Sequence, residues 1–144
     1  RGWLSPAKNQ SWNTPDLLTA NEIEYCCDWV NDDMPYQFNT EHGPMMMMPL
    51  STELEDQFII GQNLHSEDSW VEQIKDAFEF LLAESAEQGG RILALNIHPW
   101  MIGQPHRISS LEEVLDHLMG HSQVWQATSG EILDAFKQQG SQQD

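Results

Sequence analysis

The expected fold is decided by the stretch Arg91-Ile92-Leu93-Ala94-Leu95-Asn96-Ile97-His98-Pro99. The almost unbroken apolar run from Arg91 to Ile97 is typical of a parallel strand that is covered on both faces. His98 and Pro99 follow where this strand would end, and α/β enzymes keep their catalytic groups at the C-terminal ends of such strands. His98 is therefore a candidate catalytic residue, although a structural histidine beside a loop proline would look the same in the sequence.

Four helices are predicted around this stretch. The Thr-Pro-Asp start at Thr14 predicts a short helix that Asn21 would stop in a left-handed conformation. Apolar side chains at helical spacing predict a long amphipathic helix that Gly89-Gly90 would end, and two capping boxes predict two further helix starts. The capping boxes are Ser110 with Glu113 and Thr128 with Glu131, and the three longer helices are expected at Glu67 to Gln88, Ser110 to Met119 and Ser129 to Lys137. The polar tail from Gln138 onward should be frayed.

Strands are expected between these helices. Ile23 to Trp29 should be a strand parallel to Arg91 to Ile97, and Val124 to Ala127 should be a last short strand. The polar segment Asn31 to Pro44 has the composition of a long loop. Alternating strands and helices predict an α/β fold, with a parallel sheet and helices outside it.

Composition and charge limit the classes of partner. The 144 residues suffice for one modest domain, and 40% of them are hydrophobic. Six basic residues against 23 acidic residues give a net charge of −17, which repels nucleic acid and anionic membranes and leaves neutral or cationic ligands open. No stretch reaches the ~18 apolar residues of a membrane span, and we expect a cytoplasmic protein.

Two sulfur-rich stretches have structural explanations. Cys26 and Cys27 are neighbours whose side chains would point to opposite faces of a strand, which makes a disulfide between them geometrically poor. They indicate small apolar strand residues in a reducing compartment. The run Met45 to Met48 could supply soft metal ligands, but a short buried strand between two prolines is favoured over a metal site.

Four separated motifs carry a family resemblance. In chain order they are Arg1-Gly2-Trp3-Leu4-Ser5-Pro6, Thr14-Pro15-Asp16-Leu17-Leu18, Asp28-Trp29-Val30-Asn31-Asp32-Asp33-Met34-Pro35-Tyr36, and His98-Pro99 through Pro105-His106-Arg107. Together they resemble the C-terminal half of the polysaccharide deacetylase family, in the branch that also holds allantoinase-like amidohydrolases. The resemblance runs from Arg1 to about Phe136. It implies that residues 1–144 are the C-terminal portion of a single domain, a distorted (β/α) barrel of the polysaccharide deacetylase type.

The resemblance also bears on metals. Relatives carry a strand-end Asp pair and a His-Ser/Thr-x-x-His metal motif nearer the N-terminus, and neither is present here. We expect no cofactor in this chain, and a divalent metal such as zinc could be bound by the missing N-terminal half. His117 and His121 have the i, i+4 spacing of helical metal ligands, but they follow the His-Pro motif and Leu118 replaces the Ser or Thr. Gly120 is also expected to end the helix before His121, so no metal site is predicted here.

The resemblance implies three catalytic roles. Hydrolysis of an amide needs an activated water, a stabilised oxyanion and a proton for the leaving nitrogen. By resemblance, His98 is the acid that protonates the nitrogen and Asp28 is the anion that holds His98 as an imidazolium. Arg1 matches the arginine that orients the catalytic Asp of the missing half. Asp28 could equally be the cap of a loop.

Six further residues are candidate substrate contacts. Trp3 and Trp29 could wall the pocket or be core anchors. The loop after the strand adds Pro99, Trp100, His106 and Arg107. The planar fork of an arginine can hold a carboxylate or carbonyl oxygen, although a surface loop or a subunit contact would explain His106 and Arg107 as well.

Two functions of different class remain open. The first is a hydrolase of non-peptide C–N bonds that removes N-acetyl groups from an amino sugar or opens a small cyclic amide. In that case the isolated chain should be inactive. The second is a non-catalytic structural or interaction module that retains only the second half of the barrel. In both cases a half barrel leaves strand edges unpaired, so the chain should pair with the missing half or self-associate.

Overall fold

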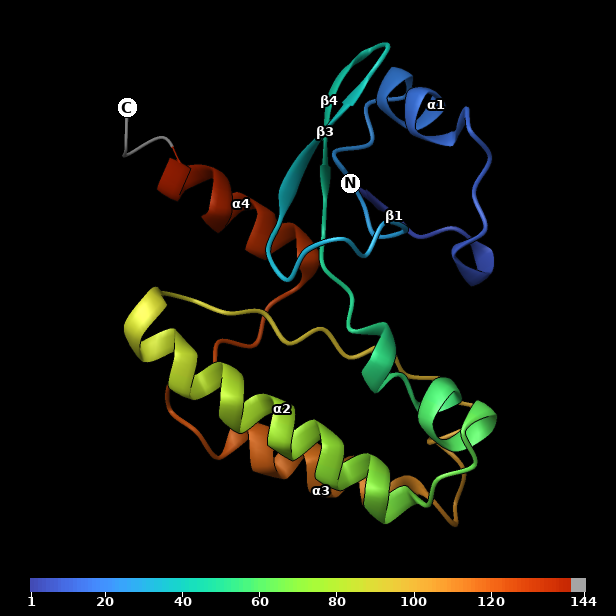
Figure 1. Ribbon diagram of the computed structural model, residues 1–144, viewed down its shortest axis with the longest axis vertical. Coiled ribbons are helices and arrows are strands. Elements are labelled where there is room, and N and C mark those ends of the chain that lie inside the picture. Colours follow the sequence, from blue (N-terminus) through green and yellow to red (C-terminus); the bar gives the residue numbers. More distant parts are fainter. Residues whose placement is uncertain (141–144) are drawn as a thin grey trace. The chain divides into compact units, whose positions relative to one another are not determined.

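The computed structural model describes residues 1–140 and divides the chain into two units (Figure 1). Unit 1 comprises Arg1–Pro49 and Gln126–Asp144, and unit 2 comprises Leu50–Trp125. Each unit has its own buried core. The frayed tail predicted from Gln138 lies partly outside the described residues, and within them the last helix, α4 (Ser129–Gly140), continues to Gly140.

Unit 1 contains an open mixed sheet of four strands. They are β1 (Gly2–Trp3), β2 (Tyr25–Cys26), β3 (Tyr36–Thr40) and β4 (Gly43–Met47), in the order β1-β2-β4-β3. β2 pairs in parallel with both β1 and β4, whereas β3 and β4 are antiparallel. The strand predicted at Ile23 to Trp29 is therefore present but reduced to two residues. Its parallel neighbours are β1 and β4, and not the segment Arg91 to Ile97 that was predicted to pair with it.

The long loop predicted at Asn31 to Pro44 is wrong. Its second half forms β3 and begins β4, which Figure 1 shows as a hairpin. Alternate residues of β3 are half-buried and exposed, which is the pattern of a strand with one solvated face. The turn needs Gly43, whose φ of 116° is in the region that favours glycine, and the Thr40 hydroxyl donates to the Gly43 carbonyl at 2.7 Å.

Methionines fill the core of unit 1, as expected if Met45 to Met48 form a short buried strand. Met45, Met47 and Met48 are almost fully buried. Met45 and Met47 pack with Leu18 and Cys26, and partly buried aromatic rings complete the cluster. Flexible thioether side chains fit such an irregular space, so the run is explained by packing.

The two α-helices of unit 1, α1 (Thr14–Ala20) and α4, differ in how well their caps were predicted. α1 starts as predicted, but Asn13 is its N-cap and the left-handed residue after it is Glu22, with φ 59°, instead of Asn21. The capping box predicted for α4 is confirmed, because the Thr128 N–H donates to Glu131 Oε2 at 2.7 Å. A short 3₁₀ turn, η1 (Pro6–Lys8), follows β1.

Unit 2 is built from helices. They are η2 (Thr52–Leu54), the π-helical segment η3 (Gln57–Gln62), α2 (Glu67–Gln88) and α3 (Ile108–Met119). The prediction for α2 is confirmed at both ends, with Ser66 as its N-cap and Gly89 as its C-cap. α3 begins two residues before the predicted start, so the Ser110–Glu113 capping box is wrong. α2 and α3 pack side by side (Figure 1).

Trp70 lies at the centre of the core of unit 2. It is fully buried, and its indole N–H donates to the Leu54 carbonyl at 3.0 Å, which satisfies the only polar atom of the side chain. The other buried members are Leu54, Ile59, Ile60, Val71, Ile74, Ile102 and Val114. No helix among residues 1–140 is long and apolar enough to cross a membrane.

The predicted strands at Arg91 to Ile97 and Val124 to Ala127 are wrong. Within the described residues neither segment belongs to a sheet. The Arg91 to Ile97 segment is instead held to η2 by one backbone bond, from Ser51 N–H to the Ala94 carbonyl at 3.3 Å. Leu93 and Leu95 pack against the core of unit 2. The apolar run is thus explained by partial burial of Leu93 and Leu95 against helices, while Ile97 is exposed. The fold is α/β with an open mixed sheet.

Cys27 should react slowly with thiol reagents. Both cysteines are free, Cys26 fully buried and Cys27 half-buried. Burial, followed by the negative charge of Asp28, raises the pKa of the Cys27 thiol to about 11. A raised thiol pKa means less thiolate at pH 8, so alkylation by iodoacetamide should be on the order of 100-fold slower than in the unfolded chain. Mass spectrometry of the native chain and the urea-unfolded chain measures the ratio, and equal rates would contradict the expectation.

Candidate active site

His98 lies in unit 2 and is held at its Nδ1 atom by a buried carboxylate. The Nδ1 atom is 2.7 Å from Asp56 Oδ1, and the His98 backbone N–H donates to Asp56 Oδ2 at 2.9 Å. Asp56 is fully buried, whereas 23% of the His98 side chain is exposed. One carboxylate therefore fixes both the backbone and the ring of His98.

Local structure explains why Asp56 is in this position. Asp56 is the N-cap of η3, and its Oδ1 accepts the Gln57 N–H at 2.9 Å. Its Oδ2 also accepts the Ile102 N–H at 3.3 Å. With the two bonds from His98 the carboxylate accepts four hydrogen bonds, which compensates for its burial.

The second ring nitrogen of His98 has a different environment. Because a carboxylate accepts hydrogen bonds, the contact with Asp56 places a proton on Nδ1 and directs Nε2 away from Asp56. Glu55 Oε1 lies 3.5 Å from Nε2 and also accepts the Asn96 side-chain N–H at 2.7 Å. With Nδ1–H held by Asp56, the neutral ring accepts a proton at Nε2, and the imidazolium so formed can donate that Nε2 proton to a bound group.

The turn after His98 holds its carbonyl. The Met101 and Ile102 N–H groups donate to the His98 carbonyl at 2.8 and 3.1 Å. This turn requires Gly103, because a Cβ atom there would lie 2.6 Å from the Pro99 carbonyl oxygen. Trp100 is more than half exposed and its ring packs edge-on against His98 at 5.3 Å between centroids. Pro99 is exposed beside it.

Arg107 has partners within the protein. Its Nε donates to Glu67 Oε1 at 2.5 Å, and its Nη1 is 3.1 Å from the Met101 sulfur. The Glu67 backbone N–H and then the guanidinium hold the pKa of the Glu67 carboxyl below its usual range. His106 is exposed. Substrate contact by His106 and Arg107 stays a prediction.

Asp28 lies in unit 1, on the segment after β2. Its Oδ1 accepts the Ser5 N–H at 2.7 Å and its Oδ2 accepts the Ser5 hydroxyl at 2.6 Å. Trp3 donates its indole N–H to the same hydroxyl at 2.9 Å. The Asp28–His98 contact expected from the sequence would be between one residue of each unit, and it stays a prediction.

Arg1 is bound by two acidic side chains of unit 1. Its Nε is 2.7 Å from Glu24 Oε1 and its Nη2 is 2.5 Å from Asp134 Oδ1. These hydrogen bonds raise the pKa of the Arg1 guanidinium and hold the pKa of both acidic partners below their usual range. The role of Arg1 in orienting a catalytic Asp stays a prediction.

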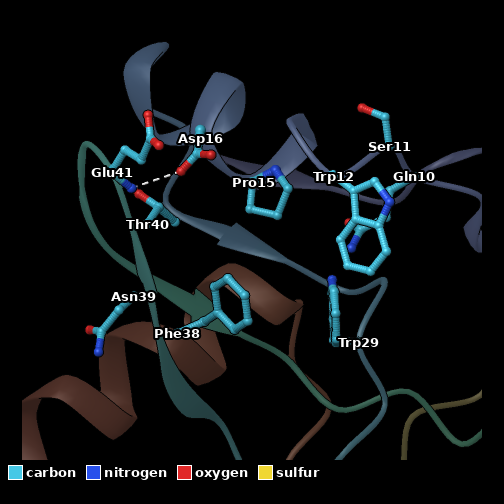
Figure 2. A pocket seen from close by; sticks show the side chains of 10 residues that line it. All are labelled: Gln10, Ser11, Trp12, Pro15, Asp16, Trp29, Phe38, Asn39, Thr40 and Glu41. Carbon is cyan, nitrogen blue, oxygen red and sulfur yellow. Dashed lines mark hydrogen bonds between the residues drawn. The ribbon is translucent and has the colours of Figure 1, made fainter.

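Trp29 lines a pocket of unit 1 with a volume of about 660 Å³ (Figure 2). Trp12, Trp29 and Phe38 surround the pocket, and the ring centroids of Trp29 and Phe38 are 5.4 Å apart. At the edge of the pocket, the Glu41 backbone N–H donates to Asp16 Oδ1 at 2.7 Å. Two buried polar atoms of this lining, Gln10 Oε1 and Trp29 Nε1, have no hydrogen-bond partner among residues 1–140, so a bound molecule could satisfy them.

Sequence reasoning missed Glu55 and Asp56. Both lie in a segment between Pro49 and α2 for which we predicted no function, more than 40 residues before His98. The signal that was available is Asp56, which lies two residues before the apolar residues Phe58 to Ile60 in the arrangement of a helix cap. It would have predicted a cap, but not that the same carboxylate binds a histidine.

Comparison with known proteins supports the resemblance. No protein-family model matches the chain. A curated protein of Schizosaccharomyces pombe named "Putative polysaccharide deacetylase" is 24% identical over 110 residues, which are 75% of this chain and 34% of that protein. The crystal structure of Puue allantoinase is 31% identical with a TM-score of 0.80, over 91% of this chain and 44% of that one.

Two further solved structures share the fold. A "probable Polysaccharide deacetylase" from Pseudomonas aeruginosa PAO1 is 27% identical with a TM-score of 0.79, over 91% of this chain and 44% of that one. A "putative polysaccharide deacetylase" from Mycobacterium smegmatis is 22% identical, with a TM-score of 0.75 and coverage of 96% and 50%.

The chain is thus a homologue of the polysaccharide deacetylases and of allantoinase. It spans about half of the solved structures and about a third of the curated relative.

Proposed function

We propose that this chain is the C-terminal half of the catalytic domain of a C–N hydrolase, and that His98 is the acid that protonates the leaving nitrogen. The observation that carries the proposal is the Asp56–His98 pair, in which a fully buried carboxylate anchors Nδ1 and leaves part of the ring exposed. Homology to a protein named as an allantoinase and to proteins named as polysaccharide deacetylases supports the reaction class. The substrate class is an N-acetylated amino sugar or a small cyclic amide.

The reaction also needs groups that activate water, which we propose lie on the other half of the domain. His98 can move a proton, but the Asp pair and the His-Ser/Thr-x-x-His motif expected to activate water are not in this sequence. Asp28, Arg1 and Trp29 would then join the site when the domain is complete. The chain would pair with that half, or associate with itself, to cover the edge strands β1 and β3 of its open sheet.

The isolated 144-residue chain should therefore show no hydrolase activity. Acetate release from N-acetylated amino-sugar oligomers and ring opening of allantoin measure the two candidate reactions. The complete protein encoded by the gene should turn over one of them, and the isolated chain should not exceed buffer blanks. Turnover by the isolated chain would overturn the assignment of water activation to the other half. A complete protein inert toward both substrates would favour the non-catalytic module.

A further inference from the structure

α2 and α3 carry a cluster of two imidazoles and one carboxylate that the proposed function does not use. Glu79 Oε1 lies 3.0 Å from His117 Nε2 and 3.7 Å from His121 Nε2. One donor atom of each residue lies within 4.8 Å of the other two. The residues come from two different helices, so their approach is set by helix packing as well as by sequence spacing.

One of the sequence arguments against a metal at this position was that Gly120 ends the helix before His121, and α3 does end at Met119 with Gly120 as its C-cap. Gly120 has right-handed helical dihedrals, with φ −67° and ψ −15°, and its N–H donates to the Asp116 carbonyl at 3.0 Å. The chain therefore keeps turning in the right-handed sense at the C-cap, and the His121 N–H donates to the Leu118 carbonyl at 3.3 Å, so His121 stays beside His117 although it lies outside α3. The two ring centroids are 5.1 Å apart.

The tautomer of His121 suits metal binding. Its Nδ1 is 2.9 Å from the His117 carbonyl oxygen, which can only accept, so Nδ1 carries the proton. The neutral ring then presents the lone pair of Nε2 toward Glu79. Such an N–H to carbonyl bond is the usual way in which proteins orient a metal-binding histidine.

Packing also holds the rings before any ion binds. Phe78 is buried and contacts both imidazoles edge-on, at 5.6 Å for His117 and 4.9 Å for His121. One helical turn before Glu79 and His117, Lys75 of α2 is 2.5 Å from Glu113 of α3, which adds an ion pair between the two helices. Rotamers that are already restricted lose less entropy on binding an ion.

We propose that Glu79, His117 and His121 bind one zinc ion that joins α2 to α3, with water in the fourth position. Two imidazole nitrogens and one carboxylate oxygen are a common zinc donor set. Zinc bonds of ~2.0–2.1 Å at tetrahedral angles place ligand atoms about 3.3 Å apart. This is close to the 3.0 and 3.7 Å that separate Glu79 Oε1 from the Nε2 atoms of His117 and His121. This ion is distinct from a catalytic metal on the other half of the domain, and its role is to stabilise unit 2.

Calorimetric titration of the metal-free 144-residue chain with Zn²⁺ tests the site. We expect one ion per chain and a loss of at least about tenfold in affinity for His117→Gln, His121→Gln and Glu79→Gln, since each removes one ligand. His42→Gln and Glu72→Gln, both exposed and outside the cluster, are the matched controls and should bind as the parent does. Equal affinities in the parent and in the double variant His117→Gln, His121→Gln would overturn the proposal.

Two measurements separate this site from other ways of binding zinc. An excess of Ca²⁺ should not displace the ion, because calcium prefers oxygen ligands, whereas ions held by the acidic surface would be displaced. Co²⁺ in place of zinc should give visible d–d absorption without a thiolate charge-transfer band, and a thiolate band would assign the ion to Cys26 or Cys27 instead. Displacement by Ca²⁺, or the thiolate band, would overturn the proposal.

Thermal unfolding gives a readout that does not depend on titration heats. An ion that binds only the folded unit should raise its melting temperature by roughly 5–10 °C at hundredfold excess over Kd. The Glu79→Gln variant keeps the shape of the side chain, and its helix content by circular dichroism should equal that of the parent. A parent chain whose melting temperature Zn²⁺ leaves unchanged would contradict the site.

Discussion

Replacing Asp56 by alanine should lower the free energy of unfolding of unit 2 by about 3–5 kcal/mol. The carboxylate is fully buried and accepts hydrogen bonds from the His98 ring and from the backbone N–H groups of Gln57, His98 and Ile102. Its removal leaves three backbone donors without their acceptor and opens a polar cavity. The helices α2 and α3 belong to the same unit, so urea denaturation followed by circular dichroism reports the loss.

Two variants calibrate that result. Asp56→Asn keeps the shape and one acceptor oxygen, so it should cost less than the alanine variant but still more than 1 kcal/mol. Asp76→Ala changes an exposed aspartate on α2 and should stay within about 0.5 kcal/mol of the parent. An Asp56→Ala protein as stable as Asp76→Ala would show that the four hydrogen bonds do not hold this region together.

Local signals predicted some elements better than others. α2 was predicted at both ends because its start, its apolar repeat and its glycine stop all lie within one segment. The stretch Arg91 to Ile97 was predicted as a strand because a continuous apolar run fits a buried strand and an extended segment against helices equally well. What distinguishes the two is a partner strand, and that depends on distant parts of the chain. β3 was missed because Gln37 and Asn39 made a half-buried strand look like a polar loop.

In the candidate site, too, residues with a local sequence signal were predicted and residues whose contacts are distant in sequence were missed. His98 was found because its motif and its position after an apolar run are both local. Asp56 was missed because its contact with His98 spans 42 positions in sequence and no local pattern encodes it. A metal site at His117 and His121 was not predicted because of the position after the His-Pro motif, Leu118 and the expected helix end at Gly120. α3 does end at Met119, but the right-handed dihedrals of Gly120 keep His121 near His117, and the third member of the cluster, Glu79, comes from another helix.

In the complete protein, His98→Ala should lower kcat by ~10²- to 10⁴-fold and leave KM nearly unchanged. This expectation follows from the proposed function, in which His98 donates a proton to the leaving nitrogen only as the C–N bond breaks. Steady-state kinetics on the substrate that the complete protein turns over measures both constants. His65→Ala, an exposed histidine of unit 2, is the control and should keep the parent rate. Near-normal turnover by the His98→Ala protein would leave His98 with a structural role only.

The two candidate carboxylates can then be compared on the same reaction. Asp56→Asn should lower kcat by roughly 10- to 100-fold, because the partner that fixes the ring and its Nδ1 proton is lost. Asp28→Asn tests the pairing expected from the sequence. If both carboxylates act through His98, the double variant should lose less than the product of the two single losses, and neither change should matter once His98 is alanine. Independent, fully multiplicative losses would mean that Asp28 acts elsewhere, and that Asp56 alone positions the acid.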